Sequence, residues 1–162
     1  VRGPQVFAGY WDDEEATAAA MLPGGWLRTG DMVRREDSFL WMTDRRRELI
    51  LTGGFNVYPS QVEAAIRAMD GIPDAAVIGL GGGADGELVC AAVVLDAGAP
   101  AGSLTLEDVR SHAERTLPHY ALPRRLEIID EIPRSAIGKV LRRVVREQIT
   151  RNEHPASKQT SR

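Results

Sequence analysis

Charged side chains and glycines stand close together where the sequence predicts sharp turns. Asp31 directly follows a glycine, and the arginine cluster Arg45–Arg47 precedes the pair Gly53-Gly54. Glycine adopts backbone angles that are closed to other residues, and it lets a ligand approach the main chain closely. A carboxylate, an arginine cluster and a glycine turn can bind a ribose, a phosphate or a pantetheine arm, although solvated loops have the same composition.

Lys139 is the sharpest single candidate. It follows a glycine at the place where we expect the last helix to begin. Backbone N–H groups at a helix N-terminus favour anions, so a lysine there can meet a carboxylate and a phosphate together. Taken alone, Lys139 is an ordinary exposed lysine and Asp31 is a turn-capping aspartate. Arg45 alone is a surface arginine paired with Asp44 or Glu48.

Four sequence segments carry more information together than any one residue does. They read Gly-Trp-Leu-Arg-Thr-Gly-Asp (25–31), Asp-Arg-Arg-Arg-Glu-Leu-Ile (44–50), Gly-Gly-Phe-Asn-Val-Tyr-Pro (53–59) and Ile-Pro-Arg-Ser-Ala-Ile-Gly-Lys-Val-Leu-Arg-Arg (132–143). In this order and spacing they resemble the adenylate-forming acyl-CoA synthetases, and most of all the long-chain fatty-acid–CoA ligases. The resemblance runs from about Val1 to about Glu147.

The resemblance implies a role in adenylation for three residues. Lys139 matches the catalytic lysine of the family, and a positioned ammonium stabilises both the attacking carboxylate and the α-phosphate of ATP. Asp31 matches the carboxylate that accepts hydrogen bonds from the ribose hydroxyls. Arg45 matches an arginine that also reaches the nucleotide.

Three further residues are implied in the thioester-forming step. Arg47 stands at the family's hinge, about which the C-terminal domain swings between two poses, although an aspartate or a lysine is commoner there. Gly53 and Gly54 match the glycine loop that lines the pantetheine channel. Three arginines on the expected outer face of the last helix either bind the phosphates of CoA or are solvated, and we slightly favour solvation. They are Arg142, Arg143 and Arg146.

By this resemblance, a complete enzyme converts a carboxylic or fatty acid, ATP and CoA into acyl-CoA, AMP and diphosphate through an acyl-adenylate. ATP, Mg²⁺ and CoA are then substrates of the complete enzyme, and none of them is needed for this chain to fold. We identify no metal-ligating residue. The phosphate loop and the acyl pocket of the family belong to a large N-terminal domain that this sequence lacks. We therefore expect a fragment that is inactive alone and has that domain as its partner.

Composition argues against several other classes of protein. Of the 162 residues, 43% are apolar and 27% are charged, as in a soluble globular protein. A formal net charge of −3 argues against general nucleic-acid binding. No apolar run approaches the roughly 18 residues of a membrane span, which leaves peripheral contact with a membrane open. The single cysteine, Cys90, fits a reducing compartment, so we expect a cytoplasmic protein.

Helices and strands alternate irregularly along the chain. One helix is expected over 12–21, and two more are expected to begin at Pro59 and at Gly138. A further helix is expected to begin at Thr105, which forms a capping box with Asp108. Strands are expected over 48–51, 75–80, 88–96 and 125–129, behind a hairpin formed by 32–35 and 39–43. This pattern predicts an α+β fold, with a small C-terminal domain that contains a mixed, mainly three-stranded sheet, about three helices and a leading β-hairpin.

We expect residues 1–46 to be a remnant of the large N-terminal adenylation domain and 47–151 to form the mobile C-terminal lid domain. Residues 152–162 are expected to be a disordered tail. Two alternatives to the synthetase stay open. The chain is either a non-catalytic module that binds CoA or a carrier, or part of an amino-acid adenylation domain of a peptide synthetase. The sequence indicates neither the acyl substrate nor the oligomeric state.

Overall fold

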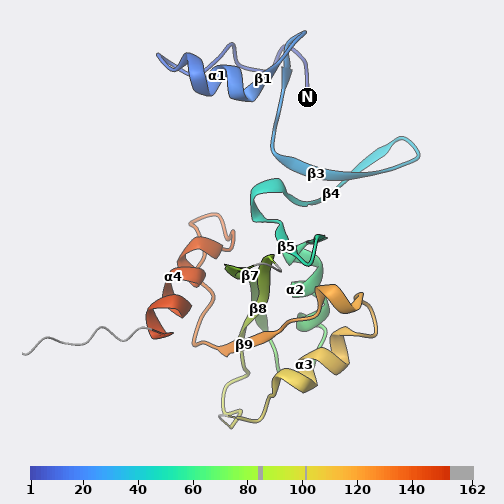
Figure 1. Cartoon of the computed structure of the whole chain (residues 1–162), viewed down its shortest axis with the longest axis vertical. Coiled ribbons are helices and arrows are strands. Elements are labelled where there is room, and N and C mark those ends of the chain that lie inside the picture. Colours follow the sequence, from blue (N-terminus) through green and yellow to red (C-terminus); the bar gives the residue numbers. More distant parts are fainter. Residues whose placement is uncertain (84–85, 101, 154–162) are drawn as a thin grey trace, which may run out of the picture. The chain divides into compact units, whose positions relative to one another are not determined.

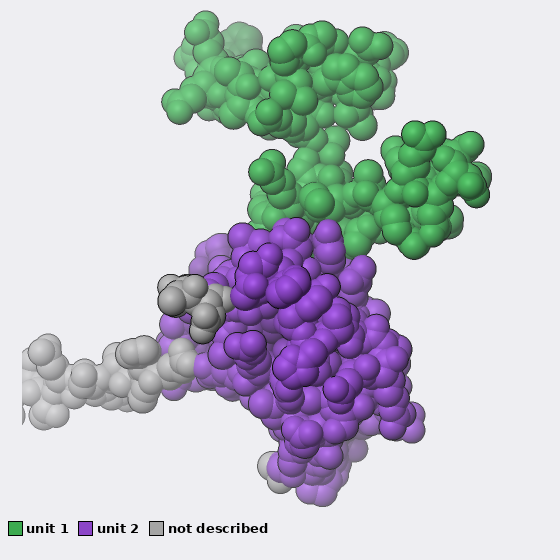
Figure 2. Space-filling view, turned by 45° about the vertical axis from the view of Figure 1, so that its right-hand side comes forward, with its two compact units in different colours: residues 1–47 green, residues 48–162 purple. Residues whose placement is uncertain are grey.

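The chain consists of two compact units, Val1–Arg47 and Glu48–Arg162, which Figure 2 distinguishes by colour. The structure is a computed structural model, and it describes residues 1–83, 86–100 and 102–153. Within these ranges, no helix is both long and apolar enough to cross a membrane.

The first unit contains one short helix and two small hairpins (Figure 1). Helix α1 (Glu14–Ala20) begins where the carboxylate of Asp13 accepts a hydrogen bond from the backbone N–H of Ala16 at 2.8 Å. Strands β1 (Met21–Leu22) and β2 (Trp26–Leu27) pair antiparallel, and so do strands β3 (Asp31–Glu36) and β4 (Phe39–Arg45). The predicted first helix and leading hairpin are confirmed.

Unit 1 has little apolar core. Among the described residues, every fully buried hydrophobic side chain belongs to unit 2. By contrast, the aromatic residues Trp11, Phe39 and Trp41 are 97%, 69% and 55% exposed. The elements of unit 1 are therefore held mainly by local hydrogen bonds, without the burial that usually dominates folding.

A five-stranded sheet forms the centre of unit 2. Its strands are β5 (Ile50–Thr52), β6 (Phe55–Val57), β7 (Asp74–Gly83), β8 (Gly86–Val94) and β9 (Arg125–Ile128). Strands β7 and β8 form a long antiparallel hairpin, and β9 pairs with β8 in parallel. The predicted mixed three-stranded sheet is this β7–β8–β9 part, to which β5 and β6 add a short hairpin.

Gly86 allows β5 to reach β8. Its φ is +82°, and a Cβ atom there would lie 2.3 Å from the carbonyl oxygen of Leu51. In the antiparallel pairing of β5 with β8, Thr52 lies opposite Gly86. A side chain at this position would therefore force the two strands apart.

Three helices cover the two faces of this sheet (Figure 1). They are α2 (Pro59–Arg67), α3 (Leu106–Ala113) and α4 (Arg142–Glu153). Successive side chains of a strand point to opposite faces. Val77 and Val89 accordingly pack in the core with α2 and α3, whereas Ile78 and Cys90 pack in the core with α4. Cys90 is therefore a buried core residue.

Two strand boundaries differ from the sequence-based prediction. A strand was predicted from Glu48, but Arg46–Glu48 forms a 3₁₀ turn, so β5 begins only at Ile50. A strand was also predicted over 75–80, whereas β7 continues through the glycine-rich segment to Gly83 and pairs with β8, which follows it.

The last helix also differs from the prediction. It begins at Arg142 and not at Gly138, because Gly138 has a φ of +78° and lies in a turn. Val145 and Ile149 face the core, whereas Leu141 is 39% exposed. The helix extends to Glu153, two residues into the predicted tail, and residues 154–162 lie outside the described part of the chain.

Candidate functional site

Asp31 and Arg45 face each other across the β3–β4 hairpin of unit 1. They are direct partners in the strand register, and Nε of Arg45 lies 3.7 Å from Oδ1 of Asp31. This distance is an ion-pair contact and too long for a hydrogen bond. The buried Oδ1 of Asp31 has no hydrogen-bond partner among the described residues. The structure therefore brings these two predicted residues together and leaves acceptor capacity on the carboxylate.

A cavity of about 520 Å³ in unit 1 adjoins the side chain of Arg45. Its lining consists of Ala19, Ala20, Arg28, Thr29, Gly30, Arg45, Arg46 and Arg47. Four of these residues are arginines, so the electrostatic potential of the cavity favours an anionic ligand. Arg47, predicted as the hinge residue, is exposed and is the last residue of unit 1.

Lys139 lies on a closed loop that connects β9 to α4. Its backbone N–H donates to Oγ of Ser135 at 3.2 Å, and its carbonyl oxygen accepts from the N–H of Ser135 at 2.8 Å. The side chain is exposed, as predicted. The proposed helix N-terminus is wrong, however, because α4 begins three residues later at Arg142. Hydrogen bonds of the loop, and not a helix dipole, fix the backbone of Lys139.

The Lys139 loop is anchored to the sheet by an arginine. Nη2 of Arg134 donates to both carboxylate oxygens of Asp74, at 2.7 and 2.8 Å, and Nη1 donates to the carbonyl oxygen of Gly138 at 2.8 Å. Asp74 is the first residue of β7. One guanidinium group thus links the beginning of a core strand to the residue that precedes Lys139.

Gly53 and Gly54 form the two-residue turn between β5 and β6. Their φ values are +54° and +80°, as a tight hairpin with two left-handed residues requires. A Cβ atom at Gly54 would meet no atom within 4 Å, so its surface is open to an approaching ligand. Beside this turn, the ring of Phe55 stacks on that of Tyr120, with centroids 4.4 Å apart and planes inclined by 11°.

Sequence reasoning missed a buried charged cluster of Glu48, Glu63 and Arg142. Glu63 is only 3% exposed and accepts hydrogen bonds from the backbone N–H of Val77 at 2.9 Å and from Arg142 at 2.8 Å. Nη1 of Arg142 also donates to Glu48. The expectation that Arg142 is solvated on the outer face of the helix is therefore wrong, because two carboxylates draw it inward.

A sequence signal for this cluster was present in α2. Pro59, Val62, Glu63 and Ile66 are the buried residues of that helix. They follow the i, i+3, i+4, i+7 spacing of a core-facing stripe. A glutamate within such a stripe requires a cationic or hydrogen-bonding partner, since an unpaired buried charge is very costly. The pattern could have revealed that a partner exists, although not which arginine provides it.

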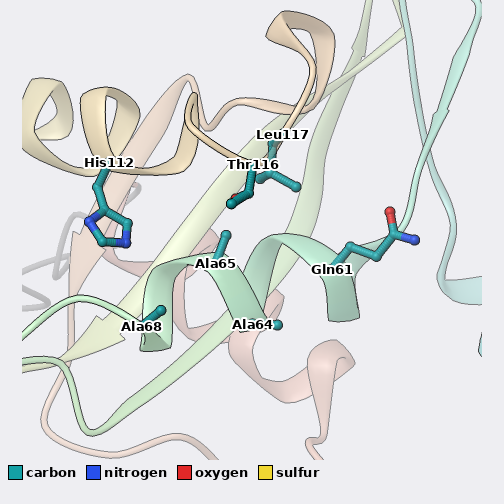
Figure 3. Close-up of a pocket in the computed structure, with 7 residues that line it drawn as sticks. All are labelled: Gln61, Ala64, Ala65, Ala68, His112, Thr116 and Leu117. Atoms are coloured by element: carbon teal, nitrogen blue, oxygen red, sulfur yellow. The ribbon is translucent and has the colours of Figure 1, made fainter.

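Unit 2 also contains a groove of about 540 Å³ between α2 and α3 (Figure 3). Its lining consists of Gln61, Ala64, Ala65, Ala68, His112, Thr116 and Leu117. The groove presents small side chains and one half-buried imidazole, and it has no charged group to hold a nucleotide. Within the described ranges, no group of three or more metal-binding side chains comes together.

Residues 61–139 match the family described as AMP-binding enzyme C-terminal domain. The chain is 41% identical over 155 residues to the long-chain-fatty-acid–CoA ligase of Bacillus subtilis, and the match covers 95% of this chain and 27% of that protein. It is 42% identical over 149 residues to the enzyme of the same name from Yersinia pestis, a match that covers 91% of this chain and 26% of that protein. The chain thus spans about a quarter of the length of these relatives.

A solved structure agrees with this match. The ATP-bound MatB of Rhodopseudomonas palustris is 35% identical, with a TM-score of 0.82, over 91% of this chain and 29% of that one. The agreement confirms the α+β fold and the resemblance that the four sequence segments indicated. This chain belongs to the adenylate-forming superfamily that includes the fatty-acid–CoA ligases, and its residues 61–139 match the AMP-binding enzyme C-terminal domain.

Proposed function

We propose that this chain acts as the C-terminal part of an AMP-forming acyl-CoA synthetase, which joins a carboxylic or fatty acid to CoA at the expense of ATP. The observation that carries the proposal is Lys139, an exposed lysine at the end of the matched segment, on a loop held by hydrogen bonds. The similarity to relatives named long-chain-fatty-acid–CoA ligase supports the same conclusion.

In the adenylation step, the substrate carboxylate attacks the α-phosphorus of ATP and diphosphate leaves. Negative charge on the two anions must be neutralised while they approach, and the ammonium group of Lys139 performs this task. The carboxylate of Asp31 accepts hydrogen bonds from the ribose hydroxyls, which fits its unsatisfied Oδ1. Arg45, held at 3.7 Å from that oxygen, contributes positive charge beside the nucleotide. Mg²⁺ accompanies ATP as part of the substrate.

In the second step, the thiol of CoA attacks the acyl-adenylate and AMP leaves. The open surface of the Gly53-Gly54 turn lets the narrow pantetheine arm pass close to the backbone. Arg47 at the end of unit 1 acts as the hinge between the two steps. With Arg142 bound by two glutamates, Arg143 and Arg146 are the cations of the outer face of α4 that remain accessible to the CoA phosphates.

The test requires a complete synthetase in which this chain forms the C-terminal part, for example a chimera with the rest of the Bacillus subtilis ligase. Lys139→Ala should lower the rate of adenylation by about 100-fold or more, because a developing charge loses its partner. Thioester formation from a pre-made acyl-adenylate should remain within about twofold, because Lys139 takes no part in that step. Both rates are measured by rapid quench.

Arg143→Ala is the matched control. Arg143 is also a basic residue near the loop, and its side chain is 81% exposed and paired only with Glu147 along the helix. Its removal should leave adenylation unchanged. Equal losses of both half-reactions in Lys139→Ala would contradict the proposed role. A chimera that activates amino acids but no fatty acid would favour the peptide-synthetase alternative, and CoA binding without any adenylation would favour the non-catalytic module.

A further inference from the structure

The backbone on both sides of Lys139 is fixed by its own loop. Ser135 forms two hydrogen bonds with the main chain of Lys139, and the N–H of Gly138 donates to the carbonyl oxygen of Ser135 at 2.8 Å. An isolated β-bridge between Arg134 and Val140 closes the base of the loop. These bonds fix the shape of the loop, but they do not attach it to the rest of unit 2.

Asp74 and Arg134 provide a polar attachment, in addition to the packing of Ile132 and Val140 against the core at the base of the loop. The bidentate contact of Arg134 with Asp74 joins residues 60 positions apart in the chain, at 2.7 and 2.8 Å. The same guanidinium holds the carbonyl oxygen of Gly138, and the carbonyl carbon of that residue forms the peptide bond to the nitrogen of Lys139. Asp74 cannot shift easily, because the three residues after it in β7, Ala75, Ala76 and Val77, are completely buried.

A lysine side chain has four rotatable methylene groups, so the position of its ammonium depends strongly on where its backbone is held. The φ of +78° at Gly138 sets the direction in which the chain enters Lys139. Because Nη2 contacts the carboxylate of Asp74 and Nη1 contacts the carbonyl oxygen of Gly138, the planar guanidinium leaves that peptide little freedom. A displacement of about 1 Å at a reacting group can cost about 100-fold in rate.

We propose that Arg134, anchored by Asp74, is a positioning residue that holds Lys139 in place for adenylation. This inference rests on the proposed role of Lys139 in that step. The side chains of Arg134 and Asp74 are 38% and 26% exposed, so removal of this ion pair changes the stability of the fold only slightly. The consequence of its loss is therefore specific to the reaction that uses Lys139.

The experiment measures both half-reactions in the complete synthetase carrying Arg134→Ala or Asp74→Asn. Each variant should lower kcat for adenylation by about tenfold or more while the KM for ATP changes little, since the loop is misplaced but the nucleotide contacts of unit 1 remain. Thioester formation from a pre-made acyl-adenylate should stay within about twofold. Arg134→Lys should fall between the wild type and Arg134→Ala, because one ammonium cannot place two nitrogens at once against the carboxylate of Asp74 and the carbonyl oxygen of Gly138.

Arg125→Ala is the matched control. Arg125 forms a comparable ion pair with Glu127 in the same unit, at 2.6 Å and with 28% and 29% exposure, but on strand β9 and away from the loop. Both rates should be normal in this variant. In addition, Arg134→Ala should cause less than about a twofold further loss of adenylation when Lys139 is already alanine, because the two residues then act through one group.

Three results are decisive. Equal losses of both half-reactions in Arg134→Ala, or a full further loss in the Lys139→Ala background, would show that Arg134 only supports the fold and would overturn the inference. Normal adenylation in Arg134→Ala together with a large defect in Lys139→Ala would also overturn it, while leaving the proposed function intact. Normal adenylation in Lys139→Ala itself would overturn the proposed function.

Discussion

Arg142 shows how a residue that appears to belong to the surface can be part of the interior. Two neighbouring arginines begin α4, but their environments are opposite. The side chain of Arg142 is 17% exposed and bonds to two glutamates, whereas that of Arg143 is 81% exposed. The buried glutamate, Glu63, also accepts the N–H of Val77 in the central sheet. Arg142 therefore joins α4, α2 and the segment after Arg47 through one group.

Arg142→Leu should destabilise unit 2 strongly, because it leaves the carboxylate of Glu63 buried without a cation. Breaking a buried pair from one side typically costs about 3–5 kcal/mol. Replacing both residues, as Glu63→Leu with Arg142→Leu, should cost less than the single Arg142→Leu change. Urea denaturation of the purified chain, followed by circular dichroism, measures both.

Arg143→Leu serves as the matched control for this measurement and should change the free energy of unfolding by less than about 0.5 kcal/mol. If Arg142→Leu and Arg143→Leu destabilise the chain equally, the buried cluster does not stabilise the fold. If the double variant is less stable than Arg142→Leu alone, the unpaired carboxylate of Glu63 is not the cause of the destabilisation.

Helix α3 was the element that its own sequence predicted best. Thr105 caps it, and the carboxylate of Asp108 accepts a hydrogen bond from the backbone N–H of Thr105 at 2.9 Å, so the predicted capping box is confirmed. The side-chain and backbone hydrogen bonds from Thr105 lower the pKa of the Asp108 carboxyl below its ordinary value. The ionised form of Asp108 is thus the form that supports the helix.

This shift predicts a pH dependence of known sign. Because the pKa of Asp108 is lower in the folded chain than in the unfolded one, the ionised carboxylate contributes fully to stability when the pH is above the pKa of the unfolded chain. This contribution is lost as the pH falls through the pKa of the folded chain. Asp108→Ala should therefore lower the Tm at pH 7, and the difference from the wild type should shrink at pH 3 and below. A difference in Tm that is as large at pH 3 as at pH 7 would contradict the assignment.

Elements whose structure is determined by neighbouring residues could be predicted from the sequence, whereas contacts between elements far apart in the chain could not. The stripe of Val62 and Ile66 in α2 and the apolar runs of β7 and β8 carry their own periodicity, so their structure followed from the sequence. The partner of Arg142 is Glu63, 79 residues away, and no local pattern indicates it. For the same reason, the resemblance identified Lys139, while the residues that hold its loop emerged only from the structure.

The two units differ in how they are stabilised, and this bears on how the molecule works. Unit 2 has a core on each face of its sheet. Unit 1 exposes the neighbouring rings of Phe39 and Trp41, whose centroids lie 6.4 Å apart, and an exposed apolar patch usually meets another protein surface. Under the proposed function, that surface is the rest of the synthetase. The domain boundary then lies at the 3₁₀ turn Arg46–Glu48, between a unit fixed to the large domain and a unit that moves.

The hinge proposal can be tested at Arg47 in the complete synthetase. The backbone there must change its dihedral angles between the two poses, whereas Glu48, one residue later, is tied to Arg142 and remains with unit 2. Proline fixes φ near −65° and restricts the preceding residue as well. Arg47→Pro should therefore spare adenylation and strongly suppress acyl transfer to CoA, as expected when a conformational step is blocked.

Arg47→Ala separates the backbone from the side chain. Arg47 is exposed, and exposed ion pairs contribute only about 0–1 kcal/mol, which biases a swing between two poses without blocking it. Arg47→Ala should therefore change both half-reaction rates by less than about fivefold, a factor that corresponds to about 1 kcal/mol. Acyl transfer at the normal rate in Arg47→Pro would show that the chain pivots elsewhere. A defect of equal size in Arg47→Ala would instead assign the effect to the guanidinium group, because alanine leaves the backbone free to rotate.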